Sequence, residues 1–239
     1  MLVNMIDMLA KAAAEGYGVG NFDVFNTELL KGVMEGAEEA NAPVILAYGP
    51  PFEKYSPLKY FAPAVKAWAA DTDLPVVLHY DHGTSLEGCV HAVECGCNSI
   101  MIDASSKPFE ENVKTVREVV DFCHPRGIPV EAELGHVGDE GEYSLENYGY
   151  TDPVQAKEFV LRTGVDFLAV AIGNQHGVYT AEPKINIHTD MLLEAIATVK
   201  GDLAAGEKSY HTMSAHHAAA VKKVALEKMR LFGSEGKGR

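Results

Sequence analysis

Short apolar segments alternate with longer segments of helical periodicity along most of the chain. The apolar segments are rich in Val, Ile and Leu, and most of them are continuous rather than alternating. Continuous apolar runs of this length are typical of parallel strands that are covered on both faces. The pattern predicts seven strands, over residues 18–22, 43–47, 75–79, 99–103, 129–133, 167–171 and 184–187.

Helical patterns fill the intervals between these strands. Thr27 is a suitable N-cap, and Pro153 fits the first turn of a helix that begins near residue 151. Repeated β-then-α units predict one α/β domain over residues 1–239, of the TIM (β/α)₈ barrel type, with a C-terminal helical tail. The other helices are predicted over residues 27–40, 60–70, 85–95, 109–124 and 211–232.

One unit of the predicted barrel is missing. A closed barrel has eight strands and about 250 residues, whereas this chain has 239 residues and seven predicted strands. The segment between residues 171 and 184 is also at the lower limit for a parallel crossover, and it has no helical pattern. We therefore expect that about one βα unit is absent between residues 180 and 186.

Composition narrows the possible classes of function. Hydrophobic residues make up 47% of the chain and charged residues 23%, as in ordinary globular proteins. The formal net charge of −14 argues against binding to nucleic acid or to anionic membranes, since such binders are normally basic. The N-terminal segment lacks the basic stretch of a signal peptide, and no apolar run reaches the roughly 18 residues of a membrane helix. We expect a cytoplasmic protein with reduced cysteines.

Polar side chains collect at the predicted C-terminal ends of the strands, which form the active face of a barrel. Asp81 and His82 follow the third strand, and His176 follows the sixth. Glu131 and Glu133 lie on one side of the fifth strand, where two buried carboxylates need cations or protons, or a salt bridge to Lys or Arg. Two histidines with carboxylates are donors of a zinc site, although a single strand-end histidine is more often structural.

The chain resembles the class II, metal-dependent ketose-bisphosphate aldolases, which act on fructose or tagatose bisphosphate. Each matching motif is modest alone, but seven of them in the order of the family are specific, and together they span nearly the whole chain. The motifs are residues 21–26 (NFDVFN), 80–83 (YDHG), 99–103 (SIMID), 130–135 (VEAELG), 166–177 (DFLAVAIGNQHG), 185–190 (INIHTD) and 227–237 (EKMRLFGSEGK).

The resemblance implies a metal centre with named residues. His82 and His176 correspond to two of the three histidines that bind zinc in the family. Glu133 corresponds to the carboxylate near the metal. Asp81 corresponds to the acid that handles protons at the reacting carbons.

The resemblance also implies contacts with a sugar-phosphate substrate. Gly177 corresponds to the site of phosphate and of a monovalent cation, Na⁺ or K⁺. The loop after residue 135 carries a catalytic glutamate in the family, and Glu140 and Glu142 both remain open for this role. The residues that correspond to substrate contacts are Asn26, Gly177, Asn186 and Thr189.

The implied reaction is the reversible cleavage of fructose or tagatose 1,6-bisphosphate to dihydroxyacetone phosphate and glyceraldehyde 3-phosphate. It passes through an enediolate, and zinc can polarise the ketone and carry that charge. The other aldolase strategy needs a Schiff-base lysine deep in the barrel. No predicted strand interior carries one, since Lys184 is at the start of its strand. The absence favours the metal route independently of the resemblance, which further implies a homodimer or a homotetramer.

The chain departs from the family pattern where the predicted gap lies. The family has a strand ending in Leu-His-Gly-Gly-Ser/Thr-Gly between the segments that correspond to residues 182–183 and 185–186. That strand supplies the third zinc histidine and much of the phosphate loop, and its absence removes roughly 30–45 residues, about one βα unit. Tyr48-Gly49 also replaces a family serine that contacts phosphate, and His188 stands where Asp or Asn is common.

Two functions of different classes therefore remain open from the sequence. The first is a zinc-dependent aldolase. The second is a degenerate, non-catalytic barrel with a structural or regulatory role. The sequence does not distinguish fructose bisphosphate from tagatose bisphosphate as the substrate.

Overall fold

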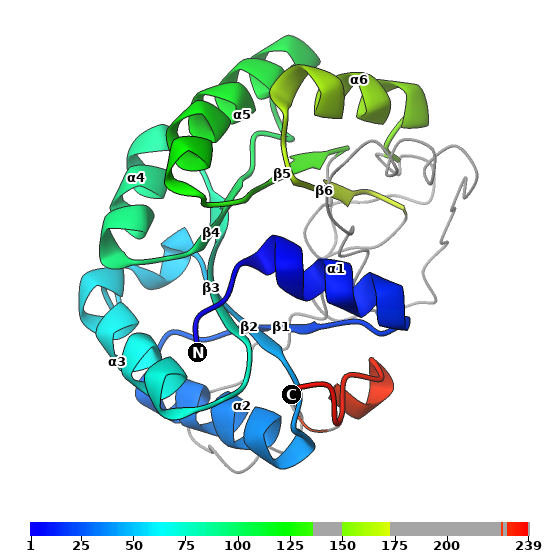
Figure 1. The fold of residues 1–239 in the computed structure, drawn as a ribbon. Helices are drawn as coiled ribbons and strands as arrows, with labels where there is room; N and C mark the ends of the chain where they lie inside the picture. Colours follow the sequence, from blue (N-terminus) through cyan, green and yellow to red (C-terminus); the bar gives the residue numbers. More distant parts are fainter. Residues whose placement is uncertain (136–149, 173–225, 227–228, 239) are drawn as a thin grey trace, which may run out of the picture.

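A curved parallel sheet forms the centre of the molecule (Figure 1). The computed structural model describes residues 1–135, 150–172, 226 and 229–238. Within these residues, six strands lie in sequence order, so the described sheet is a parallel half-barrel and confirms the predicted α/β barrel class. The strands are β1 (Gly20–Asp23), β2 (Val44–Tyr48), β3 (Val76–Gly83), β4 (Ser99–Ile102), β5 (Val130–Leu134) and β6 (Phe167–Val170).

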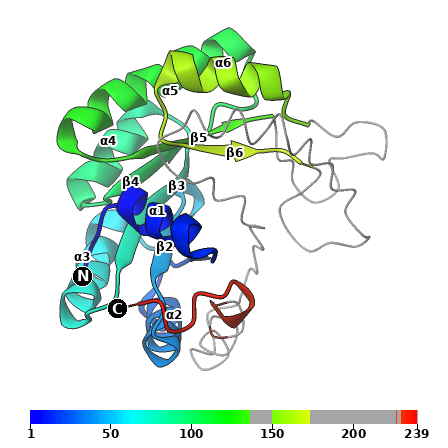
Figure 2. The same ribbon diagram turned by 45° about the vertical axis from the view of Figure 1, so that its right-hand side comes forward.

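Five α-helices connect these strands and cover the convex face of the sheet, whereas the N-terminal helix α1 lies on the concave side (Figures 1 and 2). Two short 3-10 helices, η1 (Pro50–Phe52) and η2 (His124–Arg126), add to the connections. The α-helices are α1 (Met5–Glu15), α2 (Thr27–Ala40), α3 (Leu58–Asp71), α4 (Leu86–Cys95), α5 (Phe109–Cys123) and α6 (Pro153–Thr163).

Short polar side chains set the beginnings of several helices. Ser85 caps α4 and Asp152 caps α6, each accepting hydrogen bonds from backbone amides of the first turn. The predicted cap Thr27 is instead the first helical residue of α2. The cap is Asn26, because its side-chain oxygen accepts the amide of Leu29 at 2.8 Å.

The strands bury both of their faces, as their continuous apolar sequences predict. Side chains on a strand point alternately to the two faces. In β2, Val44, Leu46 and Tyr48 belong to the large core beneath the helices, whereas Ile45 belongs to a smaller cluster on the other face. The concave side of the sheet is therefore a second packing surface, and its occupants decide what the barrel interior can do.

Helix α1 covers one end of this concave side, and the sequence pattern did not predict it. Its buried side chains Met5, Met8 and Leu9 pack against Ile45, Val77 and Phe167, which lie in the N-terminal halves of their strands. The backbone continues this attachment, since Leu2 pairs with Val76 as a parallel bridge. The helix thus fills the barrel interior at the end opposite to the predicted active face.

Some predicted elements lie outside the described residues. The seventh strand at residues 184–187 is one of them, and so is most of the tail helix at residues 211–232. Among the described helices, none is both long and apolar enough to cross a membrane. The four cysteines are free thiols, and three of them, Cys89, Cys97 and Cys123, are buried.

Candidate active site

Three side chains from neighbouring strands meet at the C-terminal end of the sheet. His82 comes from β3, Asp103 follows β4 directly, and Glu133 comes from β5. Each offers one ligand atom, and these atoms all lie within 4.8 Å of one another. Among the described residues this is the group of three with the spacing of a metal site. The sequence predicted His82 and Glu133 there, but it did not assign Asp103.

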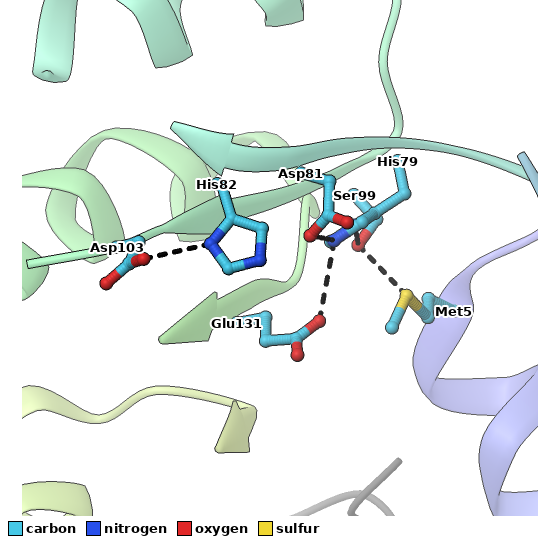
Figure 3. Close-up of polar contacts among 7 residues, drawn as sticks. All are labelled: Met5, His79, Asp81, His82, Ser99, Asp103 and Glu131. Atoms are coloured by element: carbon cyan, nitrogen blue, oxygen red, sulfur yellow. Dashed lines mark hydrogen bonds and ion pairs between the residues drawn. The ribbon is translucent and has the colours of Figure 1, made fainter. Parts of the chain in front are cut away.

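A β-bulge brings His82 into this group. Tyr80 pairs with Ile100 and Gly83 pairs with Ile102, so two residues of β3 lie opposite one residue of β4. His82 has a φ of 51°, in the left-handed region that non-glycine residues rarely adopt. Neighbouring residues of a regular strand point to opposite faces, but Figure 3 shows Asp81 and His82 on the same side of β3. Strain of this kind costs about 1–3 kcal/mol and is concentrated at functional sites.

Asp103 is held as a carboxylate beside His82. Its Oδ2 lies 2.9 Å from Nδ1 of His82, and its Oδ1 accepts the backbone amide of Ser105 at 3.0 Å. Burial raises the pKa of Asp103, but the hydrogen bonds with His82 and Ser105 lower it by more. The pKa therefore lies well below its usual range, which suits a metal ligand because ligands bind in their deprotonated form.

Glu133 is fixed through both its side chain and its backbone. The side chain is buried, and its Oε1 accepts the hydroxyl of Ser105 at 3.1 Å. The amide of Asn112, in the first turn of α5, donates to the backbone carbonyl of Glu133 at 2.9 Å. Ser105 thus contacts both carboxylates of the group and sets their spacing.

Thr151 joins the C-terminal ends of β5 and β6 by hydrogen bonds. Its hydroxyl donates to the carbonyl of Leu134, and the same hydroxyl accepts the amide of Ala171 at 2.8 Å. Its own amide donates to the carbonyl of Ala171 at 2.9 Å. The two ends of residues 135–150 are therefore anchored next to the candidate site.

A second buried polar group lies deeper in the barrel, between the same strands. The imidazole Nε2 of His79 is 3.6 Å from Oδ1 of Asp81 and 3.4 Å from Oε2 of Glu131. All three residues are at most 4% exposed. The two glutamates of β5 face the interior as predicted, but Glu131 pairs with a histidine rather than with Lys or Arg. His79 was missed, although its position two residues before Asp81 places both on one face of β3.

The structure gives two other predicted positions a local role. The side-chain oxygen of Asn26 caps α2, so its predicted contact with substrate stays a prediction. Tyr48 is fully buried in the core beneath the helices, where its hydroxyl donates to Glu53 at 2.6 Å. Tyr48 therefore replaces the family serine with a packing residue. The remaining predicted site residues lie outside the described part and stay predictions: Glu140, Glu142, His176, Gly177, Asn186 and Thr189.

The donor set fits a divalent metal with nitrogen and oxygen ligands. One imidazole nitrogen and two carboxylate oxygens within reach of one another match the ligand types of catalytic zinc. The described strands also contain no lysine, so none of them offers a Schiff-base amine to the interior. The geometry supports a metal-dependent reaction at the C-terminal end of the sheet.

Comparison with known proteins identifies a single family. The family model "Fructose-bisphosphate aldolase class-II" matches residues 3–184. The protein YdjI of Escherichia coli K12, described as uncharacterized, is 42% identical over 268 residues, covering 95% of each chain. A fructose-bisphosphate aldolase of Staphylococcus aureus Mu50 is 42% identical over 188 residues, covering 77% of this chain and 66% of that enzyme. The crystal structure of the YdjI aldolase from E. coli K12 is also similar. Its superposition covers 100% of both chains, with 38% sequence identity and a TM-score of 0.86.

The alignments also bear on the predicted gap. The alignment with YdjI extends over 268 residues, whereas this chain has 239, so part of the relative has no counterpart here. The family match ends at residue 184, inside the interval where the gap was predicted. The excess length is that of about one βα unit, roughly 30 residues or more. About 30 or more residues of this relative thus have no counterpart in the 239-residue chain.

Proposed function

Because the chain belongs to the class II fructose-bisphosphate aldolase family, whose members are generally metal dependent, we propose that it is a zinc-dependent ketose-bisphosphate aldolase. Membership of the family supports the activity of a lyase. The observation that carries the proposal is the meeting of His82, Asp103 and Glu133 at the C-terminal end of a parallel barrel sheet. The proposed reaction is cleavage of fructose or tagatose 1,6-bisphosphate into two triose phosphates.

Different residues of the chain have different roles in this proposed reaction. His82, Asp103 and Glu133 hold the metal, with His176 as a further ligand. A bound metal ion supplies Lewis acidity at the ketone oxygen of the substrate. Asp81 lies beside His82 on the same side of β3, which supports a role for its carboxylate in exchanging protons with the reacting carbons. Substrate phosphates are held by residues outside the described part, with Gly177 also contacting a Na⁺ or K⁺ ion.

The net charge of the chain favours small sugar phosphates over macromolecules as substrates. The net charge of −14 repels nucleic acids and anionic membranes, so a phosphorylated substrate is held by local groups. We propose a cytoplasmic enzyme of sugar breakdown that assembles as a homodimer or a homotetramer. Size-exclusion chromatography with light scattering measures the assembly directly.

A second function rests on the alignment gap. The segment without a counterpart includes, by resemblance, the third zinc histidine and much of the phosphate loop. A barrel that lacks both is suited to a structural or regulatory role rather than to turnover. An end-point assay of the 239-residue chain with zinc distinguishes the two functions, because the second predicts no triose phosphate at any incubation time.

The experiment that tests the metal centre compares two histidine substitutions. His82→Ala should lower bound zinc and cleavage together, because it removes the imidazole of the candidate site. His91→Ala is the matched control, since His91 lies on α4 with its side chain half exposed. Zinc content that is equal in wild type and His82→Ala, measured by elemental analysis after dialysis, would remove His82 from the site.

The substrate is tested separately. Fructose 1,6-bisphosphate and tagatose 1,6-bisphosphate differ in configuration at one carbon, and a coupled assay for triose phosphates accepts the products of both. We expect cleavage of at least one of them to depend on added zinc and to disappear with a chelator. Zinc-independent cleavage of either sugar would contradict the proposal.

A further inference from the structure

The buried polar group around His79 lies outside the candidate metal centre, and its arrangement indicates a role of its own. It consists of Met5, His79, Asp81, Ser99 and Glu131, and we call it the His79 cluster (Figure 3). Its members come from α1, β3, β4 and β5, and all are at most 4% exposed. Nδ1 of His79 lies 2.9 Å from Oγ of Ser99, and the same Oγ lies 3.0 Å from Sδ of Met5. On the other side of the ring, Nε2 faces Asp81 and Glu131.

The hydrogen bonds of Ser99 determine where the imidazole carries a proton. If the hydroxyl proton points to Met5, Ser99 accepts from Nδ1–H, and an unprotonated Nε2 would direct its lone pair at two carboxylates. That arrangement is repulsive and disfavours this orientation of the hydroxyl. If the hydroxyl instead donates to Nδ1, the neutral ring carries its one proton on Nε2. The second pattern is therefore favoured, and it places an N–H on Nε2, between Asp81 and Glu131.

This N–H lies between carboxylates of β3 and β5, which are separated in the sheet by β4. β3 contributes His79 and Asp81, β5 contributes Glu131, and Ser99 of β4 is the ladder partner of His79. Among the described residues, His79 is the basic side chain that pairs with Glu131. Without the shared donor, the two carboxylates would repel each other in a medium that screens charge poorly. The position of the Asp81 carboxylate therefore depends on His79.

We propose that His79 is a positioning residue: its Nε2–H, oriented by Ser99, holds the carboxylates of Asp81 and Glu131 so that Asp81 is aimed at the reacting centre. The inference rests on the proposed function, in which Asp81 exchanges protons with the substrate. His79 itself is fully buried and acts through Asp81. A histidine that only fills space would make the same packing contacts without needing a proton on Nε2.

Nuclear magnetic resonance of the wild-type chain tests, without any turnover, whether Nε2 of His79 carries a proton. Imidazole nitrogens are labelled with ¹⁵N, and the signals of His79 are assigned by their loss in His79→Gln. We expect a proton on Nε2 in the wild type, and a shift of its resonance in both Asp81→Asn and Glu131→Gln. His91→Gln is the control and should leave the signal unchanged. An Nε2 without a proton in the folded wild type would overturn the proposal.

The positioning role is tested by cleavage kinetics with two substitutions of different character. His79→Leu removes the donor, whereas His79→Gln keeps an N–H the same number of bonds from the backbone. We expect His79→Leu to lower kcat about 10- to 100-fold, as for other residues that orient a reacting group, with KM and bound zinc little changed. His79→Gln should recover most of the lost rate. Equal losses in both variants would contradict the role of the N–H.

A double-mutant cycle separates this inference from the proposed function. In the Asp81→Asn background, His79→Leu should cause little further loss, because the residue through which it acts is already disabled. Additive losses would show that His79 acts elsewhere. An Asp81→Asn variant as fast as the wild type, or a wild type with no cleavage, would contradict the proposed function instead. The magnetic resonance measurement would still decide whether Nε2 of His79 carries a proton.

Discussion

The two ends of the barrel interior are built from the same strands but have opposite chemistry. Toward the N-terminal ends, Ile45, Val77 and Phe167 pack against the apolar face of α1. Two residues further along β3, His79 begins a series of buried polar side chains that leads to the candidate metal centre. Because side chains on one face recur at every second residue, a single strand can supply both ends. The interior thus separates stability and chemistry along the strand direction.

The two ends meet at one contact. Ser99 lies at the start of β4, and its Oγ lies 3.0 Å from Sδ of Met5, a residue of the apolar cluster, and 2.9 Å from Nδ1 of His79. Helix α1 therefore reaches the polar end through the thioether of Met5. The comparison predicts that changes at the polar end alter turnover with little loss of stability, and that changes at the apolar end do the reverse.

Restoring the absent segment should have the largest effect. Insertion of the part of YdjI that has no counterpart here, between residues 180 and 186, should raise cleavage by orders of magnitude. By resemblance the segment supplies the third zinc histidine of the family, beside His82 and His176, and much of the phosphate loop. A full set of strands also allows the barrel to close. The measurement is the rate of triose phosphate formation.

Two further results complete this test. An insert whose His-Gly-Gly histidine is replaced by Ala should gain stability without gaining activity. The prediction is wrong if the 239-residue chain, verified by intact mass, already cleaves a ketose bisphosphate at an ordinary rate of about 1–10³ s⁻¹.

Asp81→Asn should produce the next largest effect, confined to the polar end. An amide cannot exchange protons as a carboxylate does, and groups of this kind contribute about 10²- to 10⁴-fold to the rate. Bound zinc should remain, because Asp81 is outside the group of three ligands. Turnover and zinc content are measured on the same preparation. Wild-type turnover in this variant would exclude Asp81 from proton transfer.

Leu9→Ala should act on the apolar end alone. Leu9 is 4% exposed in the cluster between α1 and the sheet, and truncation of a buried leucine costs about 2–5 kcal/mol. Denaturant unfolding measures this loss, and zinc affinity should stay as in the wild type. A matched truncation at exposed Leu161 should cost little. Weaker zinc binding in Leu9→Ala would show that the two ends are coupled.

The smallest effect isolates the strain at His82. Glycine adopts a positive φ freely, whereas alanine pays about 1–2 kcal/mol for it. His82→Gly should therefore be more stable than His82→Ala by about that amount, although both lose the imidazole and bind less zinc. Equal unfolding free energies for the two variants would mean that the bulge relaxes when the histidine is absent.

The strands were predictable because they are continuous apolar runs in a chain of regular βα units. Each described strand overlaps its predicted range, and β3 extends past its predicted end because residues 80–83, with Asp81 and His82 among them, continue the strand. Helix α1 escaped prediction because it lies outside the βα repeat and packs inside the barrel rather than on its convex face. That position follows from tertiary packing and not from a local pattern.

The candidate site was predictable in part, by residue type and strand position. The grouping of His82 with Glu133 follows from their places at the ends of parallel strands. Asp103 was not assigned because its role depends on contacts with His82 and Ser105 that no local pattern shows. The bulge was beyond prediction for a related reason. No local sequence pattern marks the extra residue in β3, so only the ladder with β4 and the positive φ of His82 reveal the bulge.

The anchoring of Thr151 makes the segment between β5 and α6 an exchangeable module. Hydrogen bonds hold residues on either side of it, Leu134 and Thr151, next to each other. The entropy of closing a loop between fixed ends grows slowly, by about 0.6 kcal/mol for each doubling of its length. Evolution can therefore lengthen, shorten or replace residues 135–150, Glu140 and Glu142 among them, at little energetic cost to the barrel. Diversity in substrate choice among related barrels can accumulate at such a position while the candidate metal site on the strands stays the same.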